Sequence, residues 1–112
     1  MSKPQKYKFV FTDGVSHDAT VSEISLPQEI CFPYEWSVFV NQVGLTTSDS
    51  TWTIEVSNDN NTFYNYKTNS LNIPVIDAYD DTHFSWTYMR INYDSKTETS
   101  GTVEFEITLK SN

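Results

Sequence analysis

The sequence predicts an all-β protein, an antiparallel β-sandwich of about eight strands that is either immunoglobulin-like or jelly-roll-like. Several short segments alternate apolar and polar residues with a period of two, as half-buried strands do. Polar turns separate these segments at short and roughly regular intervals, which is typical of sandwiches and small barrels. The composition agrees, because seven Tyr, seven Phe and three Trp favour strands, whereas the strong helix formers Ala and Leu are scarce.

The expected strands lie at residues 7–12, 19–26, 34–43, 51–57, 63–67, 71–75, 84–93 and 102–110. Residues 7–12 alternate aromatic residues with other positions, and Asp13–Gly14 after them is a strong turn signal. In residues 19–26 the apolar parity slips between Val21 and Ile24, so we expect a β-bulge or an early end of the strand.

The middle of the chain carries the longest and the clearest alternations. Residues 34–43 place most apolar side chains on one face and Phe39 on the other, which predicts a central strand covered on both sides. Residues 51–57 alternate strictly, with Trp, Ile and Val on one face. Asn58–Asn61 can turn the chain, because Asn and Asp tolerate left-handed backbone, and residues 63–67 are the expected partner strand.

The C-terminal part completes the predicted sandwich. Residues 71–75 contain a proline, which cannot donate to a ladder, so we expect an edge strand there. Residues 77–81 predict an acidic loop. The apolar set changes parity within residues 84–93, which predicts a bulge or a strand buried on both faces. Residues 94–101 predict a hairpin loop before 102–110, the most regular strand of the chain.

The length and the cysteine content bound the architecture. A chain of 112 residues suffices for one domain with one core, so we expect a single sandwich at residues 7–112 and a flexible N-terminal arm at residues 1–6. Cys31 is the single cysteine and cannot form an internal disulfide, which argues against a secreted disulfide scaffold. The sequence shows no signal peptide and no apolar run of about 20 residues, so no membrane partner is expected.

The charge balance argues against nucleic acid as a partner. Seven basic residues face fifteen acidic ones, for a formal net charge of −8, whereas a nucleic-acid binder needs a basic patch to displace counterions from phosphates. The one basic cluster is Lys3, Lys6 and Lys8, and we expect these lysines to contact a protein partner. Glu104 and Glu106 share one strand face and predict a charged outer surface.

The sequence predicts no catalytic residue, no cofactor and no metal site. Ser16, His17 and Asp18 suggest a triad by type, but adjacent strand residues face opposite ways and no nucleophile elbow is present, so a solvated turn is expected. Asp77–Asp81 and Asn58–Asn61 offer oxygen atoms that suit Ca²⁺. Their spacing is not that of an EF-hand, and the calcium alternative stays open beside that of a plain solvated loop.

The aromatic residues divide into core and surface candidates. The tryptophans follow strand parity beside aliphatic neighbours and are expected in the core: Trp36, Trp52 and Trp86. Four further aromatics point inward less clearly and are the candidate partner contacts: Phe63, Tyr64, Tyr66 and Tyr79. An exposed platform of this kind would bind carbohydrate or protein. Arg90, the only arginine, is expected to stack on a ring or to pair with a carboxylate in a structural role.

Two segments resemble a known group of proteins. The first is Trp52–Phe63, an alternating strand followed by a polar turn and an aromatic residue. The second combines Tyr88–Tyr93 (Tyr-Met-Arg-Ile-Asn-Tyr) with Gly101–Lys110 (Gly-Thr-Val-Glu-Phe-Glu-Ile-Thr-Leu-Lys). Together they resemble small β-sandwich structural proteins of tailed bacteriophages, which include capsid auxiliary or decoration proteins and tail or fibre domains. Asn60 and Asn61 stand where that pattern usually has glycine, and similar endings occur in sugar-binding sandwiches of discoidin type.

The resemblance implies a non-enzymatic virion structural protein, because the shared motif carries no catalytic residue. Its expected function is to bind the capsid or another particle surface as an auxiliary protein, in a virion assembled in the host cytoplasm. Other virion proteins are the expected partners, and a homo-oligomer is an open alternative. A carbohydrate-binding module that uses Trp or Tyr on a loop rim is the alternative function. A hydrolytic enzyme, the third hypothesis, needs a pocket with paired titratable groups.

Overall fold

The computed structural model describes residues 5–30, 35–47, 49–71, 76–80 and 86–110, and for Glu35, Lys110 and residues 76–80 it describes the backbone alone. The strands are β1 (Gln5–Lys8), β2 (His17–Asp18), β3 (Glu23–Ile24), β4 (Gln28–Glu29), β5 (Glu35–Val43), β6 (Thr51–Ser57), β7 (Tyr64–Ser70), β8 (Ile76–Asp80), β9 (Tyr88–Asp94) and β10 (Thr102–Lys110). Within these ranges there is no helix that has the length and apolar character to cross a membrane.

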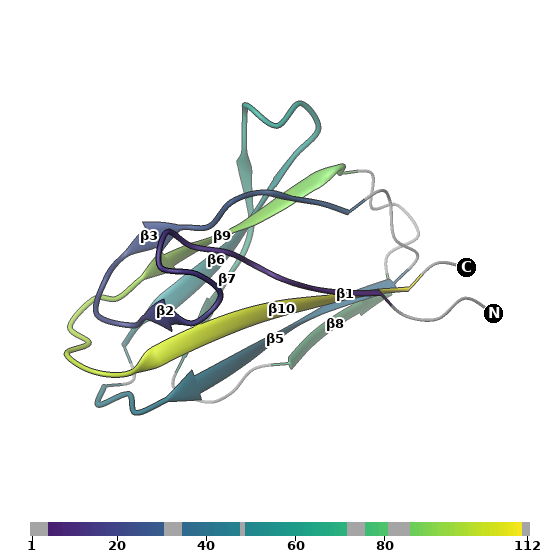
Figure 1. Ribbon diagram of the computed structural model, residues 1–112. Helices are drawn as coiled ribbons and strands as arrows, with labels where there is room; N and C mark the ends of the chain where they lie inside the picture. Colours follow the sequence, from purple (N-terminus) through teal and green to yellow (C-terminus); the bar gives the residue numbers. More distant parts are fainter. Residues whose placement is uncertain (1–4, 31–34, 48, 72–75, 81–85, 111–112) are drawn as a thin grey trace.

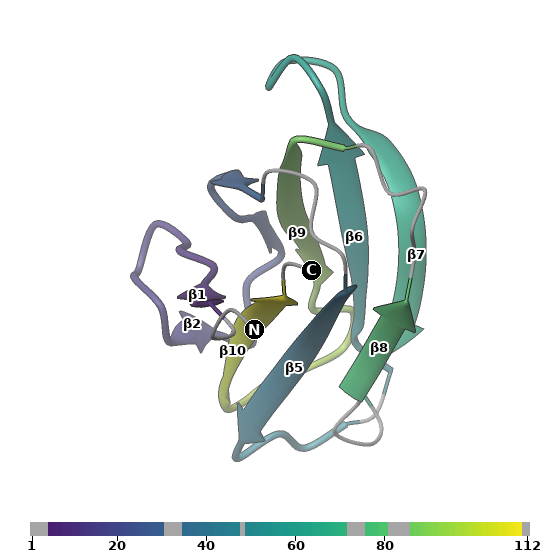
Figure 2. The same ribbon diagram turned by 90° about the vertical axis from the view of Figure 1, so that its right-hand side faces the viewer.

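The strands form two antiparallel sheets that face each other as a sandwich (Figure 1, Figure 2). The first sheet has the order β1-β10-β5-β8, and the short β2 also pairs with β10. The second has the order β3-β9-β6-β7, and the short β4 also pairs with β9. Strand β5 pairs with β10 along its whole length, and β6 pairs with β9 along its whole length. The short strands therefore pair on the opposite sides, so β1 and β2 share one edge of the first sheet, and β3 and β4 share one edge of the second.

The topology is that of a jelly roll. When β1 with β2 and β3 with β4 are counted as two interrupted strands, the described residues give eight strand positions, and the sheets have the orders 1-8-3-6 and 2-7-4-5. This is the order of double-sheet jelly rolls, and it differs from the immunoglobulin fold, in which strands A, B, E and D form one sheet. The predicted antiparallel sandwich is therefore confirmed, in its jelly-roll form.

The first edge strand is interrupted because the chain leaves the sheet between β1 and β2. The N–H of Phe9 still donates to β10, at 2.9 Å. A tight turn follows, in which Phe11 and Gly14 exchange backbone hydrogen bonds of 2.9 and 3.0 Å; Gly14 takes a φ of 105°, which suits glycine. The carbonyl oxygen of Val10 accepts a 2.8 Å hydrogen bond from the N–H of Leu26, and this bond joins the edges of the two sheets.

The core lies between the two sheets. It is built from alternate residues of the four central strands, as the period of two requires. The most deeply buried of these are Trp36, Val38, Val40, Trp52, Ile54, Val56, Met89, Ile91, Tyr93, Val103, Phe105 and Ile107. Burying a large apolar side chain stabilises a fold by about 1.5–3 kcal/mol. Trp36 and Trp52 are core residues as predicted, whereas Trp86 is only partly buried and packs against the core.

Two segments that the sequence predicted as covered or regular are exposed. Phe39, expected beneath a second layer, is 40% exposed on the outer face of β5. The strand expected at residues 19–26 is reduced to the two-residue strand β3, with Val21 and Ile24 each 45% exposed and Leu26 64% exposed. The reason is local: this stretch lies at an edge and pairs over only two residues, so its apolar side chains have no sheet above them.

The C-terminal predictions are corrected in three places. Residues 77–80 are not a loop, because they belong to β8, which pairs with β5 at an edge of the first sheet. Residues 94–101 are not a hairpin loop, because β9 and β10 lie in different sheets. The strand expected at residues 84–93 is described from Tyr88 onward as β9, where Met89, Ile91 and Tyr93 are buried with a single parity and no bulge occurs; residues 84 and 85 lie outside the described residues.

Several predictions extend beyond the described residues. Of the edge strand expected at residues 71–75, only Leu71 is described, and it is buried in a bend after β7. Residues 72–75 are not described. The arm expected at residues 1–6 overlaps β1, because Gln5 and Lys6 pair with β10, and residues 1–4 are not described. Cys31 and the side chains of the acidic segment also lie outside the description.

A buried carboxylate fastens the β9–β10 connection to the β5–β6 connection. Glu98 is 5% exposed and accepts hydrogen bonds from the backbone N–H and hydroxyl of Thr46, at 2.8 and 2.6 Å, and of Thr47, both at 3.1 Å. Burial acts to raise the pKa of Glu98, but the hydrogen bonds outweigh it and lower the pKa to about 2. Gly101 closes the same connection at a φ of 99°, and a Cβ there would lie 2.6 Å from the carbonyl oxygen of Val43.

Candidate functional site

Two of the predicted lysine contacts lie on the outer face of the first sheet. Lys6 and Lys8 are exposed on β1 and pair in register with outward-facing residues of β10. Lys8 Nζ lies 4.0 Å from Glu104 Oε1, a long surface ion pair of the kind that stabilises by less than about 1 kcal/mol. A shallow hollow of about 140 Å³ beside it is lined by Lys8, Phe39, Asn41, Glu104 and Glu106. Lys3 lies outside the described residues.

The predicted aromatic contacts lie on the second sheet, except for Tyr79 in β8, of which only the backbone is described. Tyr64 is 56% exposed, at the start of β7. Tyr66 is partly buried and packs against the core, so it belongs to the interior. Phe63 is also partly buried, with the guanidinium carbon of Arg90 3.8 Å above its ring. Tyr64 is therefore the open aromatic of this group among the described side chains.

Arg90 makes both of the contacts that the sequence suggested for it. Besides stacking on Phe63, it donates a 2.7 Å hydrogen bond from Nε to Oε1 of Glu55, its cross-strand partner on β6. The amide of Asn92 donates to the other oxygen of Glu55, at 3.0 Å. This network joins β6 to β9 on the outer face of the second sheet, and it gives Arg90 a structural role.

The tip of the β6–β7 hairpin carries a hollow of about 190 Å³, lined by Asn58, Asp59, Thr62, Tyr64 and Trp86. We call it the tip hollow. The ring centroids of Tyr64 and Trp86 are 5.7 Å apart, with the ring planes inclined at 45°. In Figure 1 the teal hairpin of β6 and β7 extends past the other strands, so the hollow lies at an extremity of the sandwich.

His17, expected in a solvated turn, is in fact 1% exposed. Its Nδ1 lies 2.8 Å from Oδ1 of Asp13, and its Nε2 lies 2.7 Å from the carbonyl oxygen of Val21. The imidazole stacks on Phe11, with ring centroids 4.2 Å apart, and meets Tyr93 edge-on at 5.7 Å. The excursion between β1 and β2 therefore folds over a buried imidazole whose two nitrogens each face an oxygen atom of the protein.

The Asp13–His17 pair has the arrangement of two members of a catalytic triad, but the third position is filled by backbone. In a triad the second imidazole nitrogen takes a proton from the nucleophile. Here that nitrogen faces the carbonyl oxygen of Val21, which has no proton to give. Asp13 also accepts a 2.8 Å bond from the N–H of Asp18; partial burial opposes the shift, but the bonds from Asp18 and His17 lower the pKa of Asp13.

Asp13, His17 and Glu23 bring three potential metal ligands within 4.8 Å of one another. Each is already engaged: Glu23 accepts from the backbone N–H and the hydroxyl of Thr12, at 2.6 and 2.8 Å, and the other two bond each other. A metal ion would have to displace these bonds. These three residues therefore fit a structural hydrogen-bond cluster better than a metal site. We call the cluster of Asp13, His17 and Glu23 the clasp.

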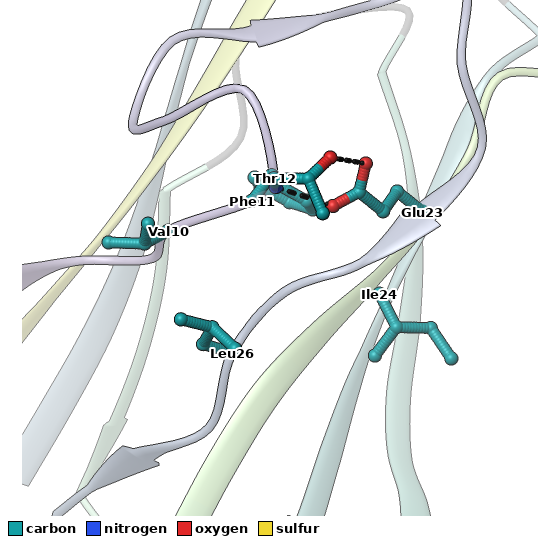
Figure 3. A pocket seen from close by; sticks show the side chains of 6 residues that line it. All are labelled: Val10, Phe11, Thr12, Glu23, Ile24 and Leu26. Atoms are coloured by element: carbon teal, nitrogen blue, oxygen red, sulfur yellow. Dashed lines mark hydrogen bonds between the residues drawn. The ribbon is translucent and has the colours of Figure 1, made fainter.

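A third hollow lies beside this clasp, at the edge where the two sheets meet. It measures about 120 Å³ and is lined by Val10, Phe11, Thr12, Glu23, Ile24 and Leu26, and we call it the edge groove. Figure 3 shows Glu23 reaching across to Thr12, with Val10 and Leu26 on facing segments. The exposed apolar side chains of Ile24 and Leu26 lie along it, so the groove offers an apolar contact surface with a polar rim.

No protein-family model, no curated protein and no solved structure gives a significant match to this chain. The structure itself defines a small all-β protein with two antiparallel sheets. The resemblance of Trp52–Phe63 and Tyr88–Lys110 to bacteriophage structural proteins stays an expectation from the sequence.

Sequence reasoning missed the clasp and the edge groove, and it placed Trp86 wholly in the core. The clasp joins residues 4, 6 and 10 positions apart through an irregular excursion, which leaves no periodic signal. The groove did have one signal, the slip of apolar parity between Val21 and Ile24. Such a slip marks the place where a strand stops presenting one face to the core.

Proposed function

We propose that this protein is a non-enzymatic structural protein of a tailed-bacteriophage particle, bound as an auxiliary protein to the capsid or another surface of that particle. The observation that carries the proposal is the edge groove. Ile24 and Leu26 are 45% and 64% exposed and line one groove at a place where two sheet edges meet. Exposed apolar side chains that gather at one groove suit contact with another protein. The partner is a virion protein with a complementary apolar ridge.

The jelly-roll order and the resemblance of the closing strands support the viral setting. Double-sheet jelly rolls occur among viral capsid and lectin domains, although a fold by itself does not fix a function. The sequence resemblance adds the specific expectation of a virion location after assembly in the host cytoplasm.

The non-enzymatic part of the proposal is supported by how the described titratable groups are used. The pair of Asp13 and His17 ends on a backbone carbonyl, Glu23 is held by Thr12, and Glu98 is held by two threonines. A general acid or base needs a proton path to a substrate. These groups have their hydrogen bonds inside the fold instead.

The test is occupancy of the purified chain on particles that lack it. Leu26→Ser and Ile24→Ser should each lower the number of bound copies, because they remove apolar contact area, while the fold should lose less than about 0.5 kcal/mol since both side chains are exposed. Val43→Ser is the matched control, since Val43 is 61% exposed outside the groove. Full occupancy of the double variant Ile24→Ser/Leu26→Ser would refute the groove as the contact.

The lysine contacts need a separate test. Removal of residues 1–4 leaves β1 intact, whereas removal of residues 1–6 also deletes the pairs that Gln5 and Lys6 make with β10. Lower occupancy of the chain without residues 1–4, at unchanged stability, would support an arm contact at Lys3. Lys6→Glu and Lys8→Glu address the outer sheet face, and light scattering of the free chain shows whether it forms a homo-oligomer.

A further inference from the structure

The tip hollow presents two aromatic faces that meet at an open angle. Tyr64 is 56% exposed, while Trp86 is anchored by partial burial against the core. Their centroid distance of 5.7 Å and inclination of 45° leave the rings splayed and not stacked flat on each other. An aromatic face carries negative charge density, which attracts the weakly positive C–H groups on one face of a sugar ring.

Two residues that line the same hollow, Asp59 and Asn58, offer an acceptor and a donor. Oδ1 of Asp59 accepts from the hydroxyl of Ser57 and from the N–H groups of Asn61 and Thr62, at 2.9, 2.9 and 2.8 Å. Among the described residues, none bonds its second carboxylate oxygen. Hydrogen bonds from the backbone N–H groups of Thr62 and Asn61 and from the hydroxyl of Ser57 lower the pKa of Asp59, so this oxygen is a charged acceptor at neutral pH.

Asn58 supplies the donor. Its Oδ1 accepts from the backbone N–H of Thr87, at 3.0 Å, and from the Thr87 hydroxyl, at 3.3 Å. The side-chain amide is thereby oriented, and within the described part of the chain its N–H groups have no acceptor. A carboxylate that accepts and an amide that donates suit two hydroxyl groups on neighbouring carbons of one ring.

The tip is preorganised. Asn60 holds a φ of 58°, a left-handed conformation that Asn tolerates. Ser57 also accepts hydrogen bonds from the N–H groups of Asp59 and Asn60, at 3.2 and 3.1 Å. Because these bonds exist before any ligand arrives, little conformational entropy is lost on binding.

We propose that the tip hollow binds a neutral pyranose residue of a glycan. Its volume of about 190 Å³ is below the range of about 300–1,000 Å³ typical of sites for drug-sized ligands, which suits a single ring at the end or side of a chain. The carboxylate of Asp59 and the net charge of −8 repel uronic acids and sialic acid. This proposal does not depend on the edge groove.

The test is a titration of the ¹⁵N-labelled full chain with methyl glucoside, methyl galactoside, methyl mannoside and N-acetylglucosamine, with glucuronic acid for comparison. At least one neutral sugar should shift the amide signals of residues 58–64 and the indole N–H of Trp86, with a dissociation constant on the order of 1 mM for one ring. Tyr64→Ala should weaken binding about tenfold because it removes one face, and Tyr64→Phe should keep it because the ring remains.

Two control variants separate this site from other surfaces. Phe39→Ala removes an exposed ring from the first sheet, and Leu26→Ser alters the edge groove; both should bind the sugar as the unmodified chain does. The proposal is overturned if no neutral sugar shifts the tip signals, if Tyr64→Ala binds as well as the unmodified chain, or if glucuronic acid binds as tightly as the neutral sugars. Loss of particle binding in Leu26→Ser with intact sugar binding would concern the edge groove alone.

Discussion

The carboxylate of Asp13 lies 2.8 Å from Nδ1 of His17, and the two side chains differ sharply in exposure, at 39% and 1%. The imidazole of His17 therefore links the partly exposed carboxylate of Asp13 to the carbonyl oxygen of Val21, which lies 2.7 Å from its other nitrogen. Three points of an irregular segment are thus held by one ring. This explains how a stretch with only two-residue strands keeps a defined path.

The first prediction concerns this pair. Asp13→Ala leaves the buried Nδ1 of His17 and the N–H of Asp18 without their acceptor, so the free energy of unfolding should fall by about 1–3 kcal/mol. Urea unfolding followed by circular dichroism measures it. Asp13→Asn keeps one acceptor oxygen and should lose less. Equal stability of Asp13→Ala and the unmodified chain would show that the pair contributes nothing.

Gly101 provides a test of close backbone packing. Alanine there adds a Cβ 2.6 Å from the carbonyl oxygen of Val43 and 2.8 Å from the backbone carbon of Gly44, at a φ of 99°, so Gly101→Ala should cost both strain and displacement. Gly14→Ala is the matched control, because its φ is 105° but no atom lies within 4 Å of the new Cβ. Gly14→Ala should cost about 1–2 kcal/mol from backbone strain alone, and Gly101→Ala should cost clearly more. Similar losses in thermal unfolding would contradict the predicted clash.

Glu98 predicts how stability depends on acid. Its folded pKa of about 2 lies below its ordinary value of 4.5, so the stability it contributes is fully present above pH 4.5 and is lost as the pH falls toward 2. Urea midpoints measured across this window should fall for the unmodified chain. Glu98→Gln cannot ionise, so the same midpoints should start lower and fall less steeply. Parallel curves for the two proteins would argue against this assignment.

The Arg90–Glu55 pair predicts a coupling between β6 and β9. Arg90→Ala leaves the carboxylate of Glu55, which is 7% exposed, with only the amide of Asn92, so unfolding should become easier by about 3 kcal/mol. Arg90→Lys keeps the charge but loses the planar contact with Phe63, and it should be intermediate. In a double-mutant cycle, Glu55→Ala should cost much less when Arg90 is already alanine. Additive losses would show that the two side chains act independently.

The regular strands were predictable because each presents one face to the core. Residues 51–57 and 102–110 alternate strictly in sequence, and both are strands in the structure. In β6 the burial departs from the pattern after Ile54, because Glu55 and Ser57 are buried as well. The order of strands in the sheets was not predictable, because period-two patterns contain no information on which strand pairs with which. The immunoglobulin and jelly-roll alternatives therefore had to be separated by the observed pairing of β10 with β1 and β5.

The candidate surfaces were predictable only in part. Tyr64 was expected to be a contact and is exposed. Its partner Trp86 was assigned to the core by strand parity, whereas it lies before the start of β9 and is only partly buried. His17 was misjudged because its burial depends on contacts with Phe11 and Tyr93. Tyr93 is far from it in the chain, and no local pattern brings the two together.

The central place of β10 in the first sheet has a consequence for how the chain reaches its fold. Strand β10 lies between β1 and β5, yet of the described strands it is the last to be synthesised. Until it leaves the ribosome, β1 and β2 have no partner strand and β5 has only β8. The first sheet is therefore completed only once β10 is available to join β1, β2 and β5. A topology so dominated by pairing between distant parts of the chain folds on the millisecond-to-second scale.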